Sequence, residues 1–462
     1  MVELVRLTYS QGTLLLSPAP PGPVGRYFRF DVRVGKYRCL AYRYRDIVSV
    51  LRELRISFRD EVLDLPECPN LSVKGVKLRD YQVEALNSWR SAGMRGVVVL
   101  PPGTGKTVIG VKAVELVSGP TLIVVPTLEL LDQWVSRIRS LLGVEPGVLG
   151  GGVKRVRCVT VSTYDSAYIN AEFLGNKFLL LVFDEVHHLP SEGYRQVAEL
   201  SAAPYRLGLT ATPEREDGLH LHLPELVGPV VYRREIPELS GKHLSRFKVV
   251  RVWVDLSDDE RRRYEELRSK FKGFFDRRGW SLRSLRDFEA LIMKSGSDRE
   301  AREALLAWLE ARDIVLNARA KIEKLKEILR WHRGDRVLVF TEHNRLVREI
   351  SRRFLIPEVS YKTSPQERRE VMKLFRQGTY SAIVTSKVLE EGVDVPEANV
   401  AVILSGSGSR REFIQRLGRV LRPREGKVAI IYEVVAKGTS ETFISRRRRR
   451  GLEGASSGPL KG

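Results

Sequence analysis

The spacing of hydrophobic positions changes several times along the chain, and these changes mark out its regions. Between residues 76 and 235, short apolar runs alternate with segments whose apolar positions recur every three or four residues. This alternation predicts parallel strands joined by helices in a doubly wound α/β arrangement. The strands are expected at residues 97–100, 121–125, 156–161, 179–183 and 206–209.

The same alternation resumes after residue 334. It predicts a second set of strands at residues 336–340, 382–385, 400–404 and 428–432. The expected fold class is therefore α/β, with two parallel-sheet domains in tandem.

Two regions outside this alternation have a different character. The first seventy-five residues contain short strand-like runs separated by Gly and Pro, which predict a small α+β module with strands at residues 4–9, 14–16, 26–34 and 37–44 and a helix at 46–54. The other region begins at Ser257, an N-cap residue followed by acidic first-turn positions, and predicts a heavily charged helical insertion.

These patterns divide the chain into six parts. They are an N-terminal module (1–75), a first α/β domain (76–235), a linker (236–256), the helical insertion (257–320), a second α/β domain (321–440) and a basic tail expected to be disordered (441–462).

Net charge points to a polyanionic partner. Lys and Arg number 78 against 57 Asp and Glu in 462 residues, a formal net charge of +21. Such an excess favours nucleic acid binding, although a solvated arginine-rich surface would have the same composition. The arginine run at residues 446–450 fits either a contact with the DNA backbone or a solvated tail.

The remaining composition argues for a cytoplasmic protein with no membrane partner. No apolar run approaches the roughly 20 residues of a membrane span, and the first residues lack the pattern of a signal peptide. Cys39, Cys68 and Cys158 are far apart and form no C-x-x-C pair, so we expect no disulfide, zinc site or iron–sulfur cluster.

The clearest chemistry lies at residues 100–107, Leu-Pro-Pro-Gly-Thr-Gly-Lys-Thr, between a predicted strand and a predicted helix. The two glycines let backbone N–H groups turn toward an anion at the N-terminus of the helix. Lys106 can reach the β- and γ-phosphates of a nucleotide, and the Thr107 hydroxyl can bind Mg²⁺. Leu100 stands where the general pattern has a glycine. The residues expected to bind the nucleotide are Gly103, Thr104, Gly105, Lys106 and Thr107.

An acidic pair follows the strand predicted at 179–183. Ligands of open α/β sheets bind at the carboxyl ends of the strands, where Asp184 and Glu185 lie. Asp184 is placed to hold Mg²⁺, directly or through water, and Glu185 to polarise an attacking water. The alternative is a strand that simply ends in an acidic turn.

Two further motifs are weaker when taken alone. Residues 208–213, Gly-Leu-Thr-Ala-Thr-Pro, end a strand with two hydroxyl side chains. Residues 415–422 open a basic helix on which Arg419 and Arg422 share a face. Two guanidinium groups there can stabilise charge on a transferring phosphoryl group, or can belong to an ordinary exposed helix.

Together and in this order, the motifs resemble those of superfamily-2 helicases and translocases of the D-E-x-H type, over about residues 77–435. Within that superfamily the chain is similar to the XPB family in its short archaeal form. The triplet Arg215-Glu216-Asp217 follows the Thr-Ala-Thr-Pro segment as it does in that family. The helical insertion and the N-terminal module lie where the family has a thumb-like and a damage-recognition-like domain.

The resemblance implies two RecA-like domains that bind ATP and Mg²⁺ between them. It implies catalytic roles for Lys106, Asp184, Glu185, Arg419 and Arg422, and nucleotide contacts for Arg79, Gln82, Gly392 and Asp394. It implies nucleic acid contact or coupling for Pro126, Thr127, Thr163, Thr210, Thr212, Thr341, Thr385 and Gln415, and a wedge or coupling element formed by Arg215, Glu216 and Asp217.

The expected function is that of an ATP-dependent DNA helicase or translocase that opens or remodels duplex DNA in nucleotide excision repair and in transcription. The expected partners are double-stranded or forked DNA and, by family analogy, a structure-specific nuclease; we expect a monomeric motor. The rival interpretations are an RNA helicase, a DNA-binding scaffold with a relict nucleotide site, and the motor subunit of a restriction-type complex.

The N-terminal module interleaves aromatic residues with arginines. If residues 37–44 form a strand that continues, Arg43 and Arg45 share one face while Tyr42 and Tyr44 share the other. Such a surface stacks bases and binds phosphates, or else presents one face to the core and one to solvent. The sequence leaves both interpretations open.

Overall fold

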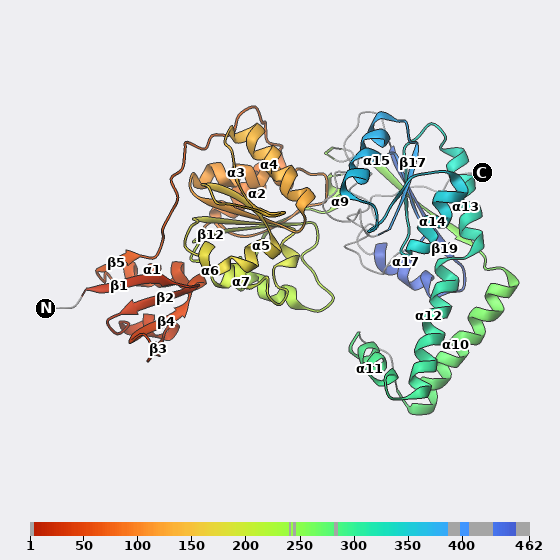
Figure 1. The fold of residues 1–462 in the computed structure, drawn as a ribbon, viewed down its shortest axis with the longest axis horizontal. Coiled ribbons are helices and arrows are strands. Elements are labelled where there is room, and N and C mark those ends of the chain that lie inside the picture. The colour runs from red at the N-terminus through yellow and green to blue at the C-terminus, as the bar shows by residue number, and fades with distance from the viewer. Residues whose placement is uncertain are drawn as a thin grey trace. The chain divides into compact units, whose positions relative to one another are not determined.

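The computed structural model describes residues 4–239, 242–243, 246–280, 285–386, 398–405 and 428–449. The chain divides into two compact units, with the first division between Glu238 and Leu239 (Figure 1). Among the described helices, none is both long and apolar enough to cross a membrane.

The first unit begins with a five-stranded sheet covered by one helix. Its strands lie in the order β3-β4-β2-β1-β5, and only the pairing of β1 with β5 is parallel. Helix α1 (Tyr44–Glu53) buries Ile47, Val48 and Leu51 against the sheet. The strands are β1 (Val5–Ser10), β2 (Thr13–Ser17), β3 (Arg29–Asp31), β4 (Lys36–Leu40) and β5 (Phe58–Glu61).

Two predicted strands of this module are shorter than expected. The strand predicted at 26–34 is reduced to β3, because a 3-10 helix with proline in its first turn occupies Gly22–Tyr27. The strand predicted at 37–44 ends at Leu40, and Tyr42 to Arg45 lie in a 3-10 turn and the start of α1. The alternating faces proposed for these tyrosines and arginines are therefore wrong.

The α/β region of the first unit contains an eight-stranded sheet in the order β13-β6-β12-β11-β7-β10-β8-β9, which is parallel except for the β8–β9 hairpin. Figure 1 shows helices on both of its faces. The five predicted strands are confirmed as β6 (Arg95–Val99), β7 (Thr121–Val125), β10 (Val159–Thr163), β11 (Leu180–Asp184) and β12 (Tyr205–Thr210). The additional strands are β8 (Gly147–Gly150), β9 (Val153–Arg155) and β13 (Val230–Arg233).

The helices of this α/β region are mostly connections between parallel strands. The longer ones are α2 (Asp80–Ser91), α3 (Lys106–Val117) and α4 (Leu128–Leu142). The shorter ones are α5 (Tyr164–Ile169), α6 (Ala171–Leu174), α7 (Gln196–Glu199), α8 (Leu223–Leu226) and α9 (Ile236–Leu239).

The N-terminal module is attached to the α/β region by specific contacts. The Tyr9 hydroxyl donates to the carbonyl of Leu200 at 3.1 Å, and Arg45 donates to the carbonyl of Gly93 at 2.7 Å. Ala202 of the α/β region belongs to the module's own hydrophobic core. The two parts therefore share a core within one unit.

A disulfide also joins the two parts, which corrects the expectation that the chain has none. Cys68, in the extended segment after β5, is bonded to Cys158 just before β10, with a Cα–Cα distance of 5.1 Å. Ninety residues separate the two cysteines in sequence. Spacing along the chain gave no sign of this pair, because the folding of the α/β region brings Cys158 to the segment that carries Cys68.

The second unit contains a six-stranded, fully parallel sheet in the order β14-β19-β18-β15-β17-β16. The predicted strands are confirmed as β15 (Val337–Phe340), β17 (Ala382–Thr385), β18 (Val400–Ile403) and β19 (Val428–Ala436). Strand β16 (Glu358–Val359) forms one edge. The helices packed around the sheet are α13 (Arg319–Trp331), α14 (Asn344–Phe354), α15 (Pro365–Gln377) and α17 (Glu441–Arg449).

The linker predicted at 236–256 is wrong in its second half. Strand β14 (Arg246–Val254) pairs along its whole length with β19, which lies about 180 residues further on. Alternate residues Val250, Val252 and Val254 pack against the hydrophobic core. This alternation with a period of two is visible in the sequence. The strand that pairs with it lies too far along the chain for the pairing to be predicted.

The charged region after β14 is helical, as predicted. Helices α10 (Asp258–Arg278), α11 (Leu285–Ser295) and α12 (Arg299–Leu316) form it. Ser257 is the N-cap of α10, as expected, and it also makes a capping box with Glu260. A small core that includes Phe274, Phe275 and Leu291 holds its outer end together.

The prediction of a disordered tail from residue 441 is wrong for its first part. Helix α17 carries Glu441 into the interior, where it accepts a hydrogen bond from the Lys321 ammonium at 2.6 Å. Ser445 donates to the buried Glu433 carboxylate at 2.8 Å. The arginine run therefore begins on a helix that is tied to the sheet, and residues 450–462 lie outside the described part of the chain.

Candidate nucleotide-binding site

The predicted phosphate loop lies between β6 and α3, as the pattern required. Gly103 and Gly105 have φ values of +79° and +80°, in the left-handed region that favours glycine, and α3 begins at Lys106. A Cβ added at Gly105 would lie 2.8 Å from the amide nitrogen of Gln82, so a side chain there would fill the loop. The Lys106 ammonium lies across the loop and donates to the carbonyl of Leu100 at 3.2 Å. This combination of glycine turn, helix N-terminus and ammonium fits a polyphosphate.

Helix α2 supports the loop from behind. The Gln82 amide donates to the carbonyl of Thr104 at 2.9 Å and accepts from the backbone N–H of Arg79 at 3.0 Å. The Tyr81 hydroxyl donates to the same Thr104 carbonyl at 2.7 Å. Tyr81, to which the sequence analysis gave no role, is therefore part of the support, and both atoms of the Gln82 amide are engaged with the protein. Adenine recognition by Arg79 and Gln82 stays a prediction.

Asp184 ends β11 as a buried carboxylate with neutral hydrogen-bond donors. One oxygen accepts from the indole N–H of Trp134 at 2.8 Å, and the other accepts from the backbone N–H of Glu185 at 3.1 Å. Burial, followed by the negative charge of Glu185, raises the pKa of Asp184 to about 6; the Trp134 hydrogen bond and the charge of Lys106 act in the opposite direction. A buried carboxylate of this kind is prepared to receive a cation.

Trp134 contacts the acidic motif, and the sequence analysis gave it no role. It lies on α4, is fully buried, and has room because the facing residue on α3 is Gly110. A Cβ at Gly110 would lie 2.4 Å from the indole ring. A tryptophan on the buried side of a helix directly after a predicted motif was the available signal, but in sequence it could not be distinguished from an ordinary core residue.

Strand β12 connects Glu185 with the Thr-Ala-Thr segment. The Thr210 hydroxyl lies 3.3 Å from a carboxylate oxygen of Glu185 and 3.1 Å from Nδ1 of the buried His187. It also accepts from the backbone N–H of Thr212 at 3.2 Å. Glu185 has a φ of +47°, a conformation that costs a non-glycine residue of the order of 1–3 kcal/mol. A strained acidic residue at a strand end, held by a neighbouring hydroxyl, is typical of a catalytic group.

Arg215 extends this connection to the predicted Arg-Glu-Asp element. Its guanidinium donates to the backbone carbonyl of His187 at 2.7 Å and to the Ser191 hydroxyl at 3.1 Å. It also makes a two-pronged pair with Asp217, at 3.0 Å and 2.6 Å, and this pairing lowers the pKa of Asp217 to about 2. The structure thus brings Arg215 and Asp217 to the acidic motif, while Glu216 is exposed.

Four of the predicted nucleic acid contacts, Thr127, Thr163, Thr341 and Thr385, have hydroxyls engaged with the protein at the carboxyl ends of strands, whereas the buried Thr212 hydroxyl has no hydrogen-bond partner within the described part of the chain. The Thr127 and Thr163 hydroxyls cap α4 and α5, and Pro126 follows β7 directly. Thr341 is buried beside Ser405, 2.9 Å away, and buried Thr385 donates to the carbonyl of Val359 at 2.9 Å. These side chains shape the strand ends, and their contact with nucleic acid stays a prediction.

Several predicted site residues lie outside the described part of the chain. They are Gly392, Asp394, Gln415, Arg419 and Arg422. Within the described part, no three His, Cys, Asp or Glu side chains converge as a metal site. Mg²⁺ keeps several water ligands and takes few from the protein, and Thr107, in the first turn of α3, and Asp184 are the residues that would hold it.

Three family models match successive parts of the chain. They describe the Xeroderma pigmentosum group B helicase damage recognition domain (residues 7–62), the res subunit of type III restriction enzymes (residues 75–215) and the helicase conserved C-terminal domain (residues 320–424). A DNA 3'-5' translocase XPB2 from Sulfurisphaera tokodaii is 47% identical over 96% of this chain and all of its own. The chain belongs to the XPB family of superfamily-2 helicases.

Other members of the family are longer than this chain. A DNA 3'-5' helicase XPB from Mycobacterium tuberculosis is 32% identical, over 83% of this chain and 65% of its own. The XPB/SSL2 subunit of general transcription and DNA repair factor IIH from Saccharomyces cerevisiae is 26% identical, over 91% of this chain and 48% of its own.

A solved structure confirms the fold expected from the family. The crystal structure of the Pyrococcus furiosus Hef helicase domain matches 80% of this chain and 98% of its own, with a TM-score of 0.52 and 21% identity. The two parallel-sheet regions are thus RecA-like helicase domains.

Proposed function

We propose that this protein is an ATP-dependent DNA translocase and helicase that moves in the 3'-to-5' direction, the direction in the names of its XPB relatives. The observation that carries the proposal is the continuous set of contacts in the first unit. It runs from Asp184 to Glu185 and Thr210 and then through His187 to Arg215, and the charge of Lys106 in the phosphate loop acts on Asp184.

In this proposal the residues of the first unit bind and activate the nucleotide. Lys106 pairs with the β- and γ-phosphates, and the N–H groups at the start of α3 surround them. A bound Mg²⁺, held through Thr107 and Asp184, would offset charge on the phosphate oxygens. Glu185 orients the attacking water and accepts its proton, while Thr210 keeps the Glu185 carboxylate in place.

The same contacts offer a path from hydrolysis to movement. Thr210 touches the catalytic carboxylate, and Arg215 touches the backbone of His187 two residues after it. A shift of the γ-phosphate group is therefore passed to the Arg-Glu-Asp element. Arg419 and Arg422 of the second RecA-like domain would complete the nucleotide site when the domains close.

The cellular role follows from the relatives and remains part of the proposal. The yeast relative is named as a subunit of a transcription and DNA repair factor, so we propose that this protein opens DNA in nucleotide excision repair and in transcription. We further propose a cytoplasmic, monomeric motor that works with a structure-specific nuclease on forked or double-stranded DNA.

One alternative has an observation of its own. The match of residues 75–215 to the res subunit of type III restriction enzymes fits a restriction-type motor. The damage-recognition match at residues 7–62 favours the repair helicase instead.

The choice of nucleic acid tests the proposal. ATP hydrolysis should be measured with duplex DNA, forked DNA, single-stranded DNA and RNA, using wild-type protein and Lys106→Ala. DNA should stimulate wild-type hydrolysis at least tenfold, and Lys106→Ala should abolish it without changing the melting temperature. Stimulation by RNA alone, or hydrolysis that survives in Lys106→Ala, would contradict the proposal.

A further inference from the structure

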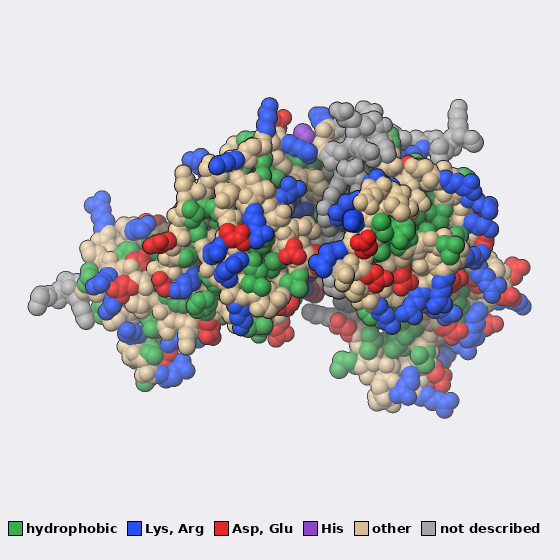
Figure 2. All heavy atoms as spheres, turned by 45° about the horizontal axis from the view of Figure 1, so that its top comes forward, with side chains coloured by type: hydrophobic (Ala, Val, Ile, Leu, Met, Phe, Trp, Pro, Cys, Tyr) green, Lys and Arg blue, Asp and Glu red, His purple; other side chains and the backbone are tan. Residues whose placement is uncertain are grey.

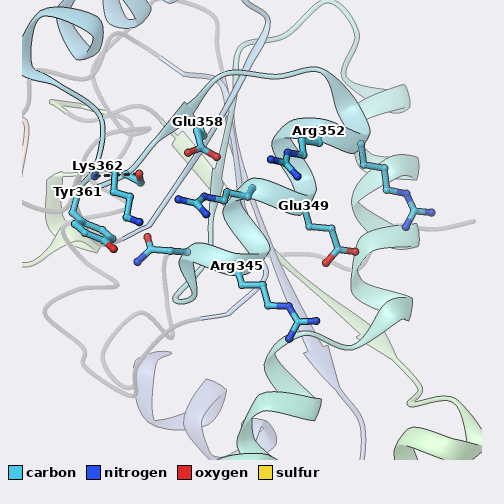
Figure 3. Close-up of a pocket in the computed structure, with 10 residues that line it drawn as sticks. Arg345, Glu349, Arg352, Glu358, Tyr361 and Lys362 are labelled. Carbon is cyan, nitrogen blue, oxygen red and sulfur yellow. Dashed lines mark hydrogen bonds between the residues drawn. The ribbon is translucent and has the colours of Figure 1, made fainter.

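A basic groove lies on the second unit, and none of the residues that line it was assigned to the nucleotide site. It runs along helix α14, has a volume of about 680 Å³, and is closed on its far side by the residues that follow β16. Figure 3 shows Tyr361 and Lys362 on one side and the arginine-bearing helix on the other. We call it the α14 groove.

Arginines of α14 form one row along the groove. Arg345, Arg348 and Arg352 are exposed and recur at three- and four-residue spacing, so they share a face of the helix. Among the residues that the structure describes, none of the three is paired with a carboxylate. Five basic side chains and two acidic ones line the groove. Its excess positive charge is therefore not cancelled by its own walls.

Position distinguishes this groove from basic surface elsewhere. Figure 2 shows Lys and Arg spread over the visible faces of both units, so charge alone does not identify a site. One end of the groove, however, is formed by Asn344, which begins α14 after β15, and by Ser360, which follows β16. In a parallel sheet these positions lie at the carboxyl edge, where Thr341 and Thr385 also lie.

The dimensions and chemistry fit a nucleic acid backbone. From Arg345 to Arg352 the helix rises about 10 Å, roughly the axial rise of three nucleotides. One guanidinium group can donate two parallel hydrogen bonds to two oxygens of a phosphate. Tyr361, 63% exposed beside the Lys362 ammonium, adds an aromatic face on which a base can stack.

We propose that the α14 groove binds the sugar-phosphate backbone of DNA, as an extension of the surface at the carboxyl ends of β15 and β17. The inference rests on the proposed function, since it assumes that the protein works on DNA. It adds a DNA-binding surface, formed by Arg345, Arg348 and Arg352, to the residues so far connected with DNA.

The test uses the full-length protein with all three arginines changed to glutamine. DNA affinity is measured at several salt concentrations for wild type and for Arg345→Gln/Arg348→Gln/Arg352→Gln. Affinity should fall at least tenfold near physiological salt, and the slope of log K against log[salt] should become shallower by about 2.7, since each of the three lost phosphate contacts contributes about 0.9. DNA-free ATP hydrolysis and the melting temperature should not change.

A charge-matched control separates local binding from loss of net charge. Arg262, Arg263 and Arg299 lie on α10 and α12, and each is already paired with a carboxylate. Changing these three to glutamine removes the same charge and should leave the salt slope near that of wild type. Replacing the three groove arginines with lysine should restore most of the slope, because phosphate binding depends mainly on charge.

The possible outcomes are distinct. An unchanged affinity and slope in the groove variant would overturn the inference, including the case in which an acidic protein is the real occupant. An equal loss in the control variant would overturn it as well. If wild-type protein shows no DNA-stimulated hydrolysis, the proposed function itself fails, and that result is independent of the groove variant.

Discussion

Each unit buries a carboxylate, and the two differ in their hydrogen-bond partners. Asp184 of the first unit is held by two neutral N–H donors and, among the described residues, has no salt bridge. Glu441 of the second unit pairs with the fully buried Lys321 ammonium and accepts from the backbone N–H of Ala436 at 3.0 Å. In the proposed function Asp184 binds Mg²⁺, whereas Glu441 is paired with an ammonium of the protein itself.

The comparison separates a functional charge from a structural one. Lys321 also donates to the carbonyl of Leu404 at 2.8 Å, so the pair in the second unit joins α13, α17 and the end of β18. Breaking such a pair leaves an uncompensated buried charge. At Asp184 burial instead raises the pKa of the carboxyl, and a pKa raised in this way is typical of sites that bind a ligand.

The largest expected effect comes from removing the charge at Asp184. Asp184→Asn should lower DNA-stimulated ATP hydrolysis about 10³-fold, because the negative charge that would hold Mg²⁺ is lost. The melting temperature should stay equal or rise, since ionisation of this buried acid opposes folding. Steady-state ATPase assays and thermal unfolding measure both quantities. A large drop in stability would place Asp184 in the same class as Glu441 and break the comparison.

The second-largest effect is expected in the second unit, where a substitution should lower stability and leave activity nearly unchanged. Lys321→Met leaves Glu441 buried and unpaired, and should lower the free energy of unfolding by about 3–5 kcal/mol. Hydrolysis per folded molecule should change less than threefold. Denaturant unfolding and ATPase assays on the same sample give the two values. A Lys321→Met variant that is as stable as wild type but inactive would contradict the comparison.

The disulfide is expected to stabilise the first unit and to leave the stability of the second unit unchanged. Cys158→Ala should cost about 2–4 kcal/mol, since the closed loop is long. Unfolding of wild type and variant should be compared with and without a reducing agent, and the difference should vanish once the wild-type bond is reduced. A difference that persists under reduction would show that the Cys158 side chain stabilises by packing instead.

Trp134→Phe examines the neutral donor at Asp184 directly. The substitution keeps an aromatic ring on α4, and it removes the indole N–H together with the part of the indole that faces Gly110. A lost hydrogen bond to a charged group is worth about 1.5–3 kcal/mol. The Mg²⁺ concentration that gives half-maximal nucleotide binding should therefore change at least tenfold, measured with a fluorescent ATP analogue. Unchanged Mg²⁺ dependence would mean that Trp134 acts only as core.

The smallest expected effect concerns Asp217. Its pKa of about 2 lies below the ordinary value near 3.8, so the Arg215 pair stabilises the folded state above that ordinary value and loses this contribution as the pH falls toward 2. Because the Asp217 side chain is 41% exposed, Asp217→Asn should cost less than about 1 kcal/mol at pH 7. The difference should shrink between pH 4 and pH 2. A difference that grows in this range would contradict the assigned pairing.

The local parts of the site could be predicted from the sequence. A strand, a glycine loop and a helix follow one another within a few residues, as do β11 and its acidic pair, so their placement needed no distant partner. The second α/β region and the helical insertion follow from the same kind of local pattern, whereas the role of the Arg-Glu-Asp triplet is implied by the resemblance to the family.

Features that depend on distant partners were missed. Strand β14 is stabilised by β19 about 180 residues away, and Cys68 by Cys158, ninety residues away. Trp134 reaches Asp184 across fifty residues. In each case the local sequence is also compatible with an ordinary core or loop residue, and only the three-dimensional fold identifies the residue with which it interacts.

The most direct test of the whole account is ATP-driven displacement of a third strand from duplex DNA by wild type and by Glu185→Gln. The account predicts that wild type displaces the strand only with ATP, and that Glu185→Gln binds ATP and DNA with wild-type affinity but displaces nothing. Equal displacement by the two proteins would contradict the assignment of Glu185 as the group that activates water.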